Sequence, residues 1–239
     1  MMIHYVCVAT ESKLYFPHLK QLLPELIVLG MGMKWTNYSL KIKLLMEYLE
    51  TLKDDDIVCF IDAYDVLPTN NIVKLERQFV KFINKNSEVK MIVGGGVIKN
   101  GIQKIGNDIV FGESPINSGT YIGYVKQIKH IWSIVLKKTN ISDDQVELIK
   151  YAKKNPKDIY IDSRNDFFCV VSQPLKQVNL NGNKKCSFIH ANGNGCLEDF
   201  LLEHHDIYVD LKTRIANYTI HLNTIIKKVK TYTKRFILK

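Results

Sequence analysis

The stretch IVCFIDAYDV at residues 57–66 is the part of the sequence that decides both fold and site. Ile57 to Ile61 form a short apolar run, which is typical of a buried strand. Two carboxylates three positions apart, Asp62 and Asp65, follow it directly. Ligands of parallel α/β sheets bind at the carboxyl ends of the strands. We therefore expect a buried strand that delivers two acidic side chains to a binding edge.

The segments before this strand alternate between strand and helix patterns. IHYVCVA at 3–9 and ELIVLG at 25–30 are apolar runs that predict strands, and helical spacing predicts helices near 13–23 and 38–52. This order predicts an α/β fold with a Rossmann-like, mostly parallel sheet and helices on both faces.

Charge divides the chain into two parts, at about Leu211. The formal net charge of the 239 residues is +9. Residues 211–239 hold eight Lys or Arg and no acid, which leaves 25 basic against 24 acidic residues in 1–210. We expect one domain over 1–210 and a basic, amphipathic helical extension over 211–239. A nearly neutral body argues against a basic groove for nucleic acid, so we expect no nucleic-acid partner.

The extension has a heptad-like apolar pattern. Its apolar residues are spaced alternately by four and three: Leu211, Ile215, Tyr218, Leu222, Ile225, Val229, Tyr232 and Phe236. Three interpretations remain open. The helix packs on its own domain, pairs with a second copy in a homodimer, or attaches to an acidic surface such as a membrane.

The acidic pair after the strand suggests metal chemistry. Asp62 and Asp65 can share one hard divalent cation and leave its other positions to phosphate oxygens and water. Such a cation assists the departure of a diphosphate. The plainer interpretation is that both acids cap the following turn.

Three further segments carry polar residues at the ends of apolar runs. PINSGTYIG at 115–123 offers Asn117 for sugar hydroxyls, beside Gly119, which permits close backbone approach. SDDQ at 142–145 adds Asp143 and Asp144, which equally suit an ordinary helix N-terminus. IHANG at 189–193 supplies His190, which taken alone suits a structural role as well as a ligand.

In their order these segments resemble the glycosyltransferase domain of the procollagen-lysine hydroxylases. The resemblance covers roughly residues 3–200 and rests on these motifs: CVATES at 7–12, VLGMGMKW at 28–35, FIDAYDV at 60–66, INSG at 116–119, DDQ at 143–145 and IHANG at 189–193. The chain differs from the family at 93–100, where VGGGVIKN has no Trp and no acidic residue.

The resemblance implies the GT-A fold and a set of ligand-binding roles. It implies Mn²⁺ bound by Asp62, Asp65 and His190. It implies uridine contacts from Thr10, Trp35 and Tyr64, and diphosphate contacts from Asn192 and Gly193. It also implies that Asn117, Asp143 and Asp144 face the donor sugar and the acceptor as catalytic residues.

The activity implied by the resemblance is retaining transfer of glucose from UDP-glucose to galactosyl-hydroxylysine of a collagen-like protein. One alternative is UDP-galactose as donor to hydroxylysine itself. A second is a non-enzymatic basic binding module that acts through the extension, and a third is a metal-dependent phosphohydrolase.

The sequence also bears on location. No stretch approaches the roughly 18 apolar residues of a membrane span, so we expect no transmembrane segment. The N-terminus MMIHYVCVAT shows no basic segment followed by an apolar one, so we expect no secretory signal and, by default, a cytoplasmic protein.

Overall fold

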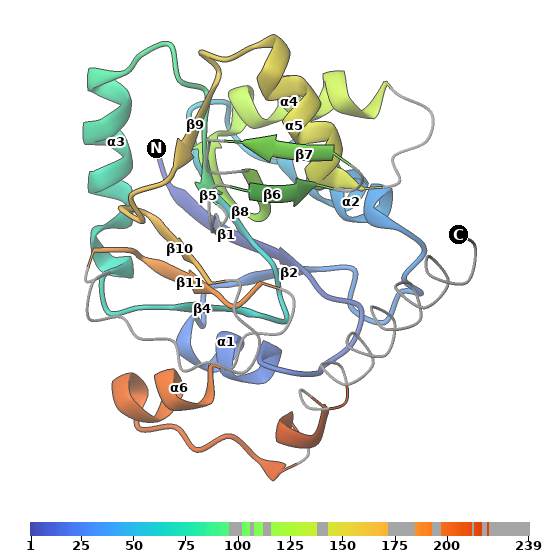
Figure 1. Ribbon diagram of the computed structural model, residues 1–239, viewed down its shortest axis with the longest axis vertical. Helices are drawn as coiled ribbons and strands as arrows, with labels where there is room; N and C mark the ends of the chain where they lie inside the picture. The colour runs from blue at the N-terminus through green and yellow to red at the C-terminus, as the bar shows by residue number, and fades with distance from the viewer. Residues whose placement is uncertain are drawn as a thin grey trace.

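The computed structural model describes most of the N-terminal nine-tenths of the chain (Figure 1). The described residues are 1–95, 116–137, 143–171, 185–192, 197–211, 213–216 and 219, together with the backbone of two strands over 102–105 and 108–111.

The core of the fold is a six-stranded sheet with strand order β2-β1-β3-β8-β5-β9. Its strands are β1 (Ile3–Val8), β2 (Ile27–Leu29), β3 (Ile57–Ile61), β5 (Met91–Gly95), β8 (Ile116–Tyr124) and β9 (Ile159–Asp162). All neighbouring pairs are parallel except those of β8, which runs antiparallel to both β3 and β5. The prediction of a mostly parallel sheet is confirmed.

Helices cover both faces of this sheet (Figure 1). One face packs against α2 (Tyr38–Leu49), α4 (Val125–Leu136) and α5 (Asp144–Lys154). The other shares a core with α1 (Phe16–Leu22) and α3 (Leu75–Lys85), with a 3-10 turn η1 (Ile72–Lys74) ahead of α3. Helix α6 (Glu198–His205) lies beyond α1 in Figure 1 and contacts Pro68 through His205. Alternate residues of β3 serve the two faces: Cys59 belongs to one core and Phe60 to the other.

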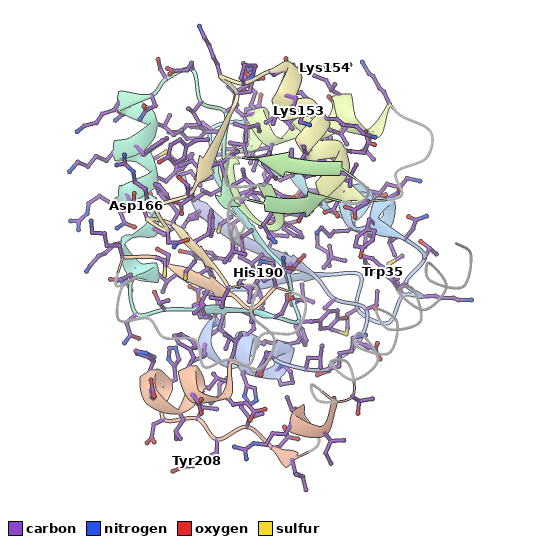
Figure 2. All side chains as sticks on the ribbon, viewed as in Figure 1. Trp35, Lys153, Lys154, Asp166, His190 and Tyr208 are labelled. Atoms are coloured by element: carbon purple, nitrogen blue, oxygen red, sulfur yellow. The ribbon has the colours of Figure 1, made fainter. Side chains whose placement is uncertain are left out.

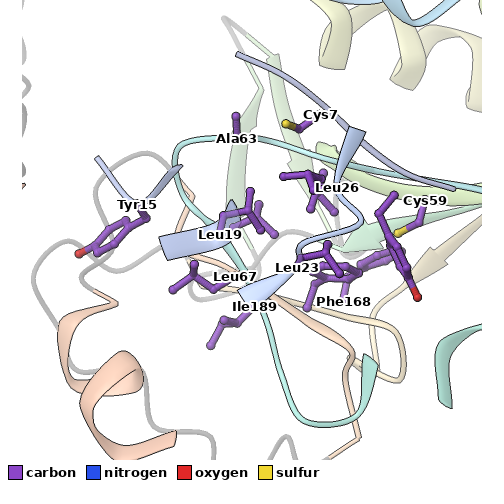
Figure 3. Packing of buried hydrophobic residues seen from close by; sticks show 14 of the residues in the cluster. Cys7, Tyr15, Leu19, Leu23, Leu26, Cys59, Ala63, Leu67, Phe168 and Ile189 are labelled. Carbon is purple, nitrogen blue, oxygen red and sulfur yellow. The ribbon is translucent and has the colours of Figure 1, made fainter. Parts of the chain in front are cut away.

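A small second sheet lies beyond the acidic pair. Its strand order is β10-β11-β4, with β4 (Val66–Pro68), β10 (Phe168–Val170) and β11 (Phe188–His190). The antiparallel register of β11 and β4 places His190 opposite Val66, the residue after Asp65. Leu19 and Leu23 of the α1 segment pack among Leu67, Phe168 and Ile189 of this sheet (Figure 3). Because both sheets share this core, the second sheet is fixed relative to β3.

Two antiparallel strands, β6 (Ile102–Ile105) and β7 (Asp108–Phe111), form a separate ribbon. No disulfide joins the four described cysteines, Cys7, Cys59, Cys169 and Cys186, all of which are buried.

The start of the C-terminal extension contacts the domain through an ion pair, in which Arg214 Nε lies 3.1 Å from Glu198 Oε2 of α6. Leu211 is 72% exposed and Ile215 is 56% exposed, so the first two positions of the apolar pattern face solvent. The other six positions, and the expected helix over most of 211–239, lie outside the described residues. Across the described residues, no helix combines the length and the apolar character that crossing a bilayer requires.

Candidate metal and nucleotide site

Two acids and an imidazole converge at the carboxyl end of β3. One ligand atom from each of Asp62, Asp65 and His190 lies within 4.8 Å of the other two. Asp62 is positioned by its backbone N–H, which donates to the carbonyl of Gly119 at 2.7 Å. The backbone carbonyl of Asp65 accepts from the N–H of Ala191 at 2.8 Å, which brings His190 Nε2 to 3.3 Å from Asp65 Oδ2.

Gly119 provides the space in which the three side chains meet. The register of β5 with β8 shifts between Val93 and Gly94, so that β8 bulges beside the cluster. A Cβ atom at position 119 would lie 2.3 Å from His190 Cε1 and 2.6 Å from Asp62 Oδ2. Any side chain there would therefore push His190 or Asp62 away.

The electrostatics of the cluster favour a bound cation. Burial raises the pKa of Asp62 above its usual range, and the nearby Asp65 carboxylate raises it further, although Lys41 opposes the rise. Burial lowers the pKa of His190, but the carboxylates of Asp65 and Asp62 outweigh that effect and raise it. Without a cation, protons therefore relieve the crowded negative charge, and a metal ion would replace them.

The donor atoms also suit a metal ion. His190 is 1% exposed, and within the described residues its Nδ1 has no hydrogen-bond partner. An imidazole beside two carboxylates is a set of ligands that fits Mn²⁺ better than Mg²⁺.

A buried lysine links this cluster to α5. Lys41 of α2 is only 6% exposed, and its Nζ lies 3.0 Å from Asp62 Oδ1 and 2.7 Å from Asp144 Oδ2. Burial lowers the pKa of Lys41, but the Asp62 and Asp144 carboxylates outweigh that effect and raise it, so the side chain stays protonated. Lys41 thus compensates the half-buried Asp62 and the buried Asp144, and joins the first turn of α5 to the cluster.

A cavity of about 370 Å³ opens beside the acidic pair. Its lining residues are Val8, Thr10, Glu11, Lys13, Trp35, Tyr38, Lys41, Asp62, Ala63, Tyr64 and Asp65. All three residues implied in uridine binding, Thr10, Trp35 and Tyr64, are among them. Trp35 lies toward the outside of the molecule and is 43% exposed, whereas His190 lies near its centre (Figure 2).

The structure places the other predicted site residues in different ways. Asn117 is buried, and its Oδ1 accepts from the N–H of Gly119 at 2.9 Å. Asp143 caps α5, because its Oδ1 accepts from the N–H groups of Gln145 and Val146. Asn192 is exposed and does not line the described cavity. Gly193 lies outside the described residues.

Sequence reasoning missed Lys41 and Tyr38. Lys41 is in phase with the buried Leu45 and Leu49 on the inner face of α2, and a lysine at such a position is itself a signal of a buried partner. Tyr38 lines the cavity and packs edge-to-face on Trp35 at 5.9 Å between ring centroids. Its proximity to Asp143 and Asp144, which together with burial raise its pKa, follows from tertiary structure alone.

The mostly parallel sheet, with an acidic pair and a cavity at its carboxyl edge, is consistent with the GT-A fold, and a family match shows that the chain is a glycosyltransferase. The chain belongs to the family of the PLOD glycosyltransferase domain, whose model matches residues 3–226. This match continues past Leu211, and the domain boundary expected there stays a prediction.

Other comparisons add nothing to the function. No curated protein matches the chain. Similar solved structures include 4-diphosphocytidyl-2C-methyl-D-erythritol synthase from Anaerococcus prevotii, with TM-score 0.40, 13% identity, and 67% of this chain and 87% of that chain covered. A197 from STIV gives TM-score 0.42 and 13% identity over 67% and 81% of the two chains. Bifunctional IspDF from Campylobacter jejuni gives TM-score 0.39 and 10% identity, with 67% of this chain and 49% of that chain covered.

Proposed function

We propose that this glycosyltransferase is metal-dependent and transfers a hexose from a UDP-sugar. The reaction that we propose is retaining transfer of glucose from UDP-glucose to galactosyl-hydroxylysine of a collagen-like protein. The observation that carries the proposal is the meeting of Asp62, Asp65 and His190 at the edge of a cavity large enough for part of a nucleotide.

The residues of the chain have separate proposed roles. Asp62, Asp65 and His190 would hold Mn²⁺, which when bound stabilises the negative charge of the departing diphosphate. Thr10, Trp35 and Tyr64 form walls for the uridine. Asn192 and Gly193 are proposed to contact the diphosphate.

The bond between the anomeric carbon and the UDP oxygen breaks, and a bond to the acceptor oxygen forms. The acceptor's proton moves to the departing UDP oxygen, so no side chain has to act as a strong base. We propose that Asn117, Asp143 and Asp144 orient the sugar and the acceptor hydroxyl. Asp143 caps α5 through its Oδ1 atom. Both of the hydrogen bonds described for its side chain use that atom, so Oδ2 is available to a hydroxyl of the ligand. Positioning and electrostatics would supply most of the rate.

A UDP-release assay tests the donor and the acceptor together. UDP-glucose and UDP-galactose are each supplied with collagen peptides that carry hydroxylysine or galactosyl-hydroxylysine, in Mn²⁺ and in EDTA. We expect the highest rate for UDP-glucose with the galactosylated peptide, in Mn²⁺. A higher rate for UDP-galactose with plain hydroxylysine would replace the proposed reaction with the galactosyl alternative. No release from either donor would refute the proposal.

A further inference from the structure

Lys13 lies on the wall of the cavity, over an aromatic ring. Its Nζ is 4.8 Å from the centroid of the Tyr64 ring and 2.6 Å from Glu11 Oε1. All three residues line the cavity that also contains Asp62 and Asp65. The ammonium group is therefore placed at the proposed nucleotide site, close to a ring that can also pack against the ligand.

The loop that carries Lys13 is held at both ends by Tyr64. The N–H of Thr10 donates to Tyr64 Oη at 3.1 Å, and the N–H of Tyr15 donates to the Tyr64 carbonyl at 3.3 Å. Between these anchors, Leu14 adopts φ +51°, a left-handed conformation that is strained for a bulky residue. Such strain persists where the surrounding structure fixes it, often at a ligand site. The loop thus holds the Lys13 side chain toward the cavity.

Lys13 is placed to compensate the negative charge of a ligand in the cavity. The other lysine of the described lining, Lys41, is buried between Asp62 and Asp144. Lys13 pairs with Glu11 instead, and both side chains are largely exposed, so that this ion pair is weak and easily exchanged. A nucleoside diphosphate entering the cavity would meet three carboxylates, those of Glu11, Asp62 and Asp65. Its charge needs compensation beyond the cation that the cluster would hold.

We propose that Lys13 is a residue that gives the donor site its specificity for a nucleoside diphosphate over a nucleoside. When the ligand binds, the Lys13 ammonium would leave Glu11 and bind a phosphate oxygen. The ammonium starts from its place over the Tyr64 ring, 4.8 Å from the centroid, and has to move only from Glu11 to the ligand. The ammonium then forms a hydrogen bond to an ionised phosphate oxygen, a group that a nucleoside without phosphate lacks. This inference rests on the proposed UDP-sugar donor.

Titration of Lys13→Gln with UDP and with uridine, in saturating Mn²⁺, tests the proposal. UDP is followed by calorimetry and uridine by ligand-observed NMR, which reaches weak affinities. We expect the affinity for UDP to fall about tenfold, as for the loss of one charged hydrogen bond, and the affinity for uridine to stay the same. Lys13→Arg should restore most of the UDP affinity, and Glu11→Gln, which releases Lys13, should bind UDP at least as tightly as the wild type.

A matched control removes one positive charge elsewhere. Lys20→Gln, on the exposed side of α1, should leave UDP affinity unchanged and so exclude a general charge effect. Equal UDP affinity of Lys13→Gln and wild type would overturn the inference and leave the proposed donor intact. An equal loss for UDP and uridine would also overturn it, because Lys13 would then act through the Tyr64 ring. A wild-type chain that does not bind UDP would overturn both this inference and the proposed donor.

Discussion

Gly119 is the residue at which the metal cluster is most sensitive to a small change. In Gly119→Ala the new methyl group would overlap His190, 2.3 Å from Cε1, so that His190 must move away from the two acids. We expect the affinity for Mn²⁺ to fall at least about tenfold, since one of three ligands is displaced. Calorimetric titration with Mn²⁺ measures the change.

Gly32→Ala is the matched control for this prediction. Among the described residues, no atom beyond the two chain neighbours lies within 4 Å of a Cβ at position 32, although its φ of +81° makes a side chain there strained. We expect Gly32→Ala to lose some stability and to keep wild-type Mn²⁺ affinity. If Gly119→Ala binds Mn²⁺ as tightly as Gly32→Ala does, the cluster does not hold the ion.

Lys41 gives a prediction about stability. Lys41→Met removes the cation that compensates the buried carboxylate of Asp144 and the half-buried carboxylate of Asp62. Breaking a buried ion pair from one side costs about 3–5 kcal/mol, so we expect a loss of that size in urea unfolding without metal. The double variant Lys41→Met with Asp144→Asn should lose less than the single one. A loss under about 1 kcal/mol, as for an exposed pair, would contradict the structural role of Lys41.

At the scale of elements, the start of α5 separates two roles of Asp143. Asp143→Ala removes the hydrogen bonds to Gln145 and Val146, and we expect it to lower the free energy of unfolding by about 1 kcal/mol. Asp143→Asn should keep the stability, because Asn caps helices equally well. If Asp143 also orients a sugar hydroxyl, the Asn variant folds normally and transfers sugar more slowly. An Ala variant as stable as the wild type would contradict the capping role.

The turn before β9 gives a prediction about pH. Asp158 Oδ2 accepts from Tyr151 Oη at 2.5 Å and from Lys90 Nζ at 2.9 Å, which connects α5 to the start of β5. Burial raises the pKa of Asp158, but these hydrogen bonds outweigh it and lower the pKa below its usual value. A lowered folded-state pKa gives stability that is present at neutral pH and is lost as pH falls through that pKa.

We therefore expect Asp158→Asn to be less stable than the wild type at pH 7, by about 1–3 kcal/mol. The difference should shrink as the pH falls below the usual pKa of an aspartate, about 4. Urea unfolding at a series of pH values measures it. A difference that stays constant, or grows toward acid pH, would contradict the ionised role of Asp158.

The longer elements could be predicted from the sequence. The strand expected over Ile57–Ile61 and the helix expected from Tyr38 both occur, because their apolar spacing matches the face that they bury. The strands β4 and β10 were not predicted. Each has three residues and is defined by its pairing with the distant β11. The local sequence of β4 or β10 carries no signal of that pairing. Asp143 is the N-cap of α5, in keeping with the helix N-terminus that the sequence suggested for Asp143 and Asp144.

At the scale of the whole molecule, the site depends on that same distant pairing. The sequence alone predicts that Asp62 and Asp65 lie at the edge of the sheet, whereas their meeting with His190 requires β11 to pair with β4. The family resemblance implied His190 as a third ligand, and its side chain lies near both acids, while its role as a ligand stays a prediction. Lys41 could have been suspected from its phase on α2, but its two partners come from β3 and α5, which only the folded chain brings together.

The C-terminal extension bears on whether the molecule associates with a second copy or with a surface. Leu211 and Ile215 are exposed among the described residues, so the first contact of the extension with the domain is the ion pair of Arg214 with Glu198 rather than the apolar pattern. Pairing with a second copy and attachment to an acidic surface both remain predictions. Eight positive charges without an acid over 211–239 would repel in a homodimer, more strongly at low salt.

The most direct test is a titration of the wild type and Asp65→Ala with UDP-glucose, in Mn²⁺ and in EDTA. The account predicts that the wild type binds one Mn²⁺ per chain, that UDP-glucose binds only with the ion present, and that Asp65→Ala folds normally but loses both ligands. UDP-glucose binding of equal strength in EDTA, or wild-type affinity of Asp65→Ala for Mn²⁺, would contradict it.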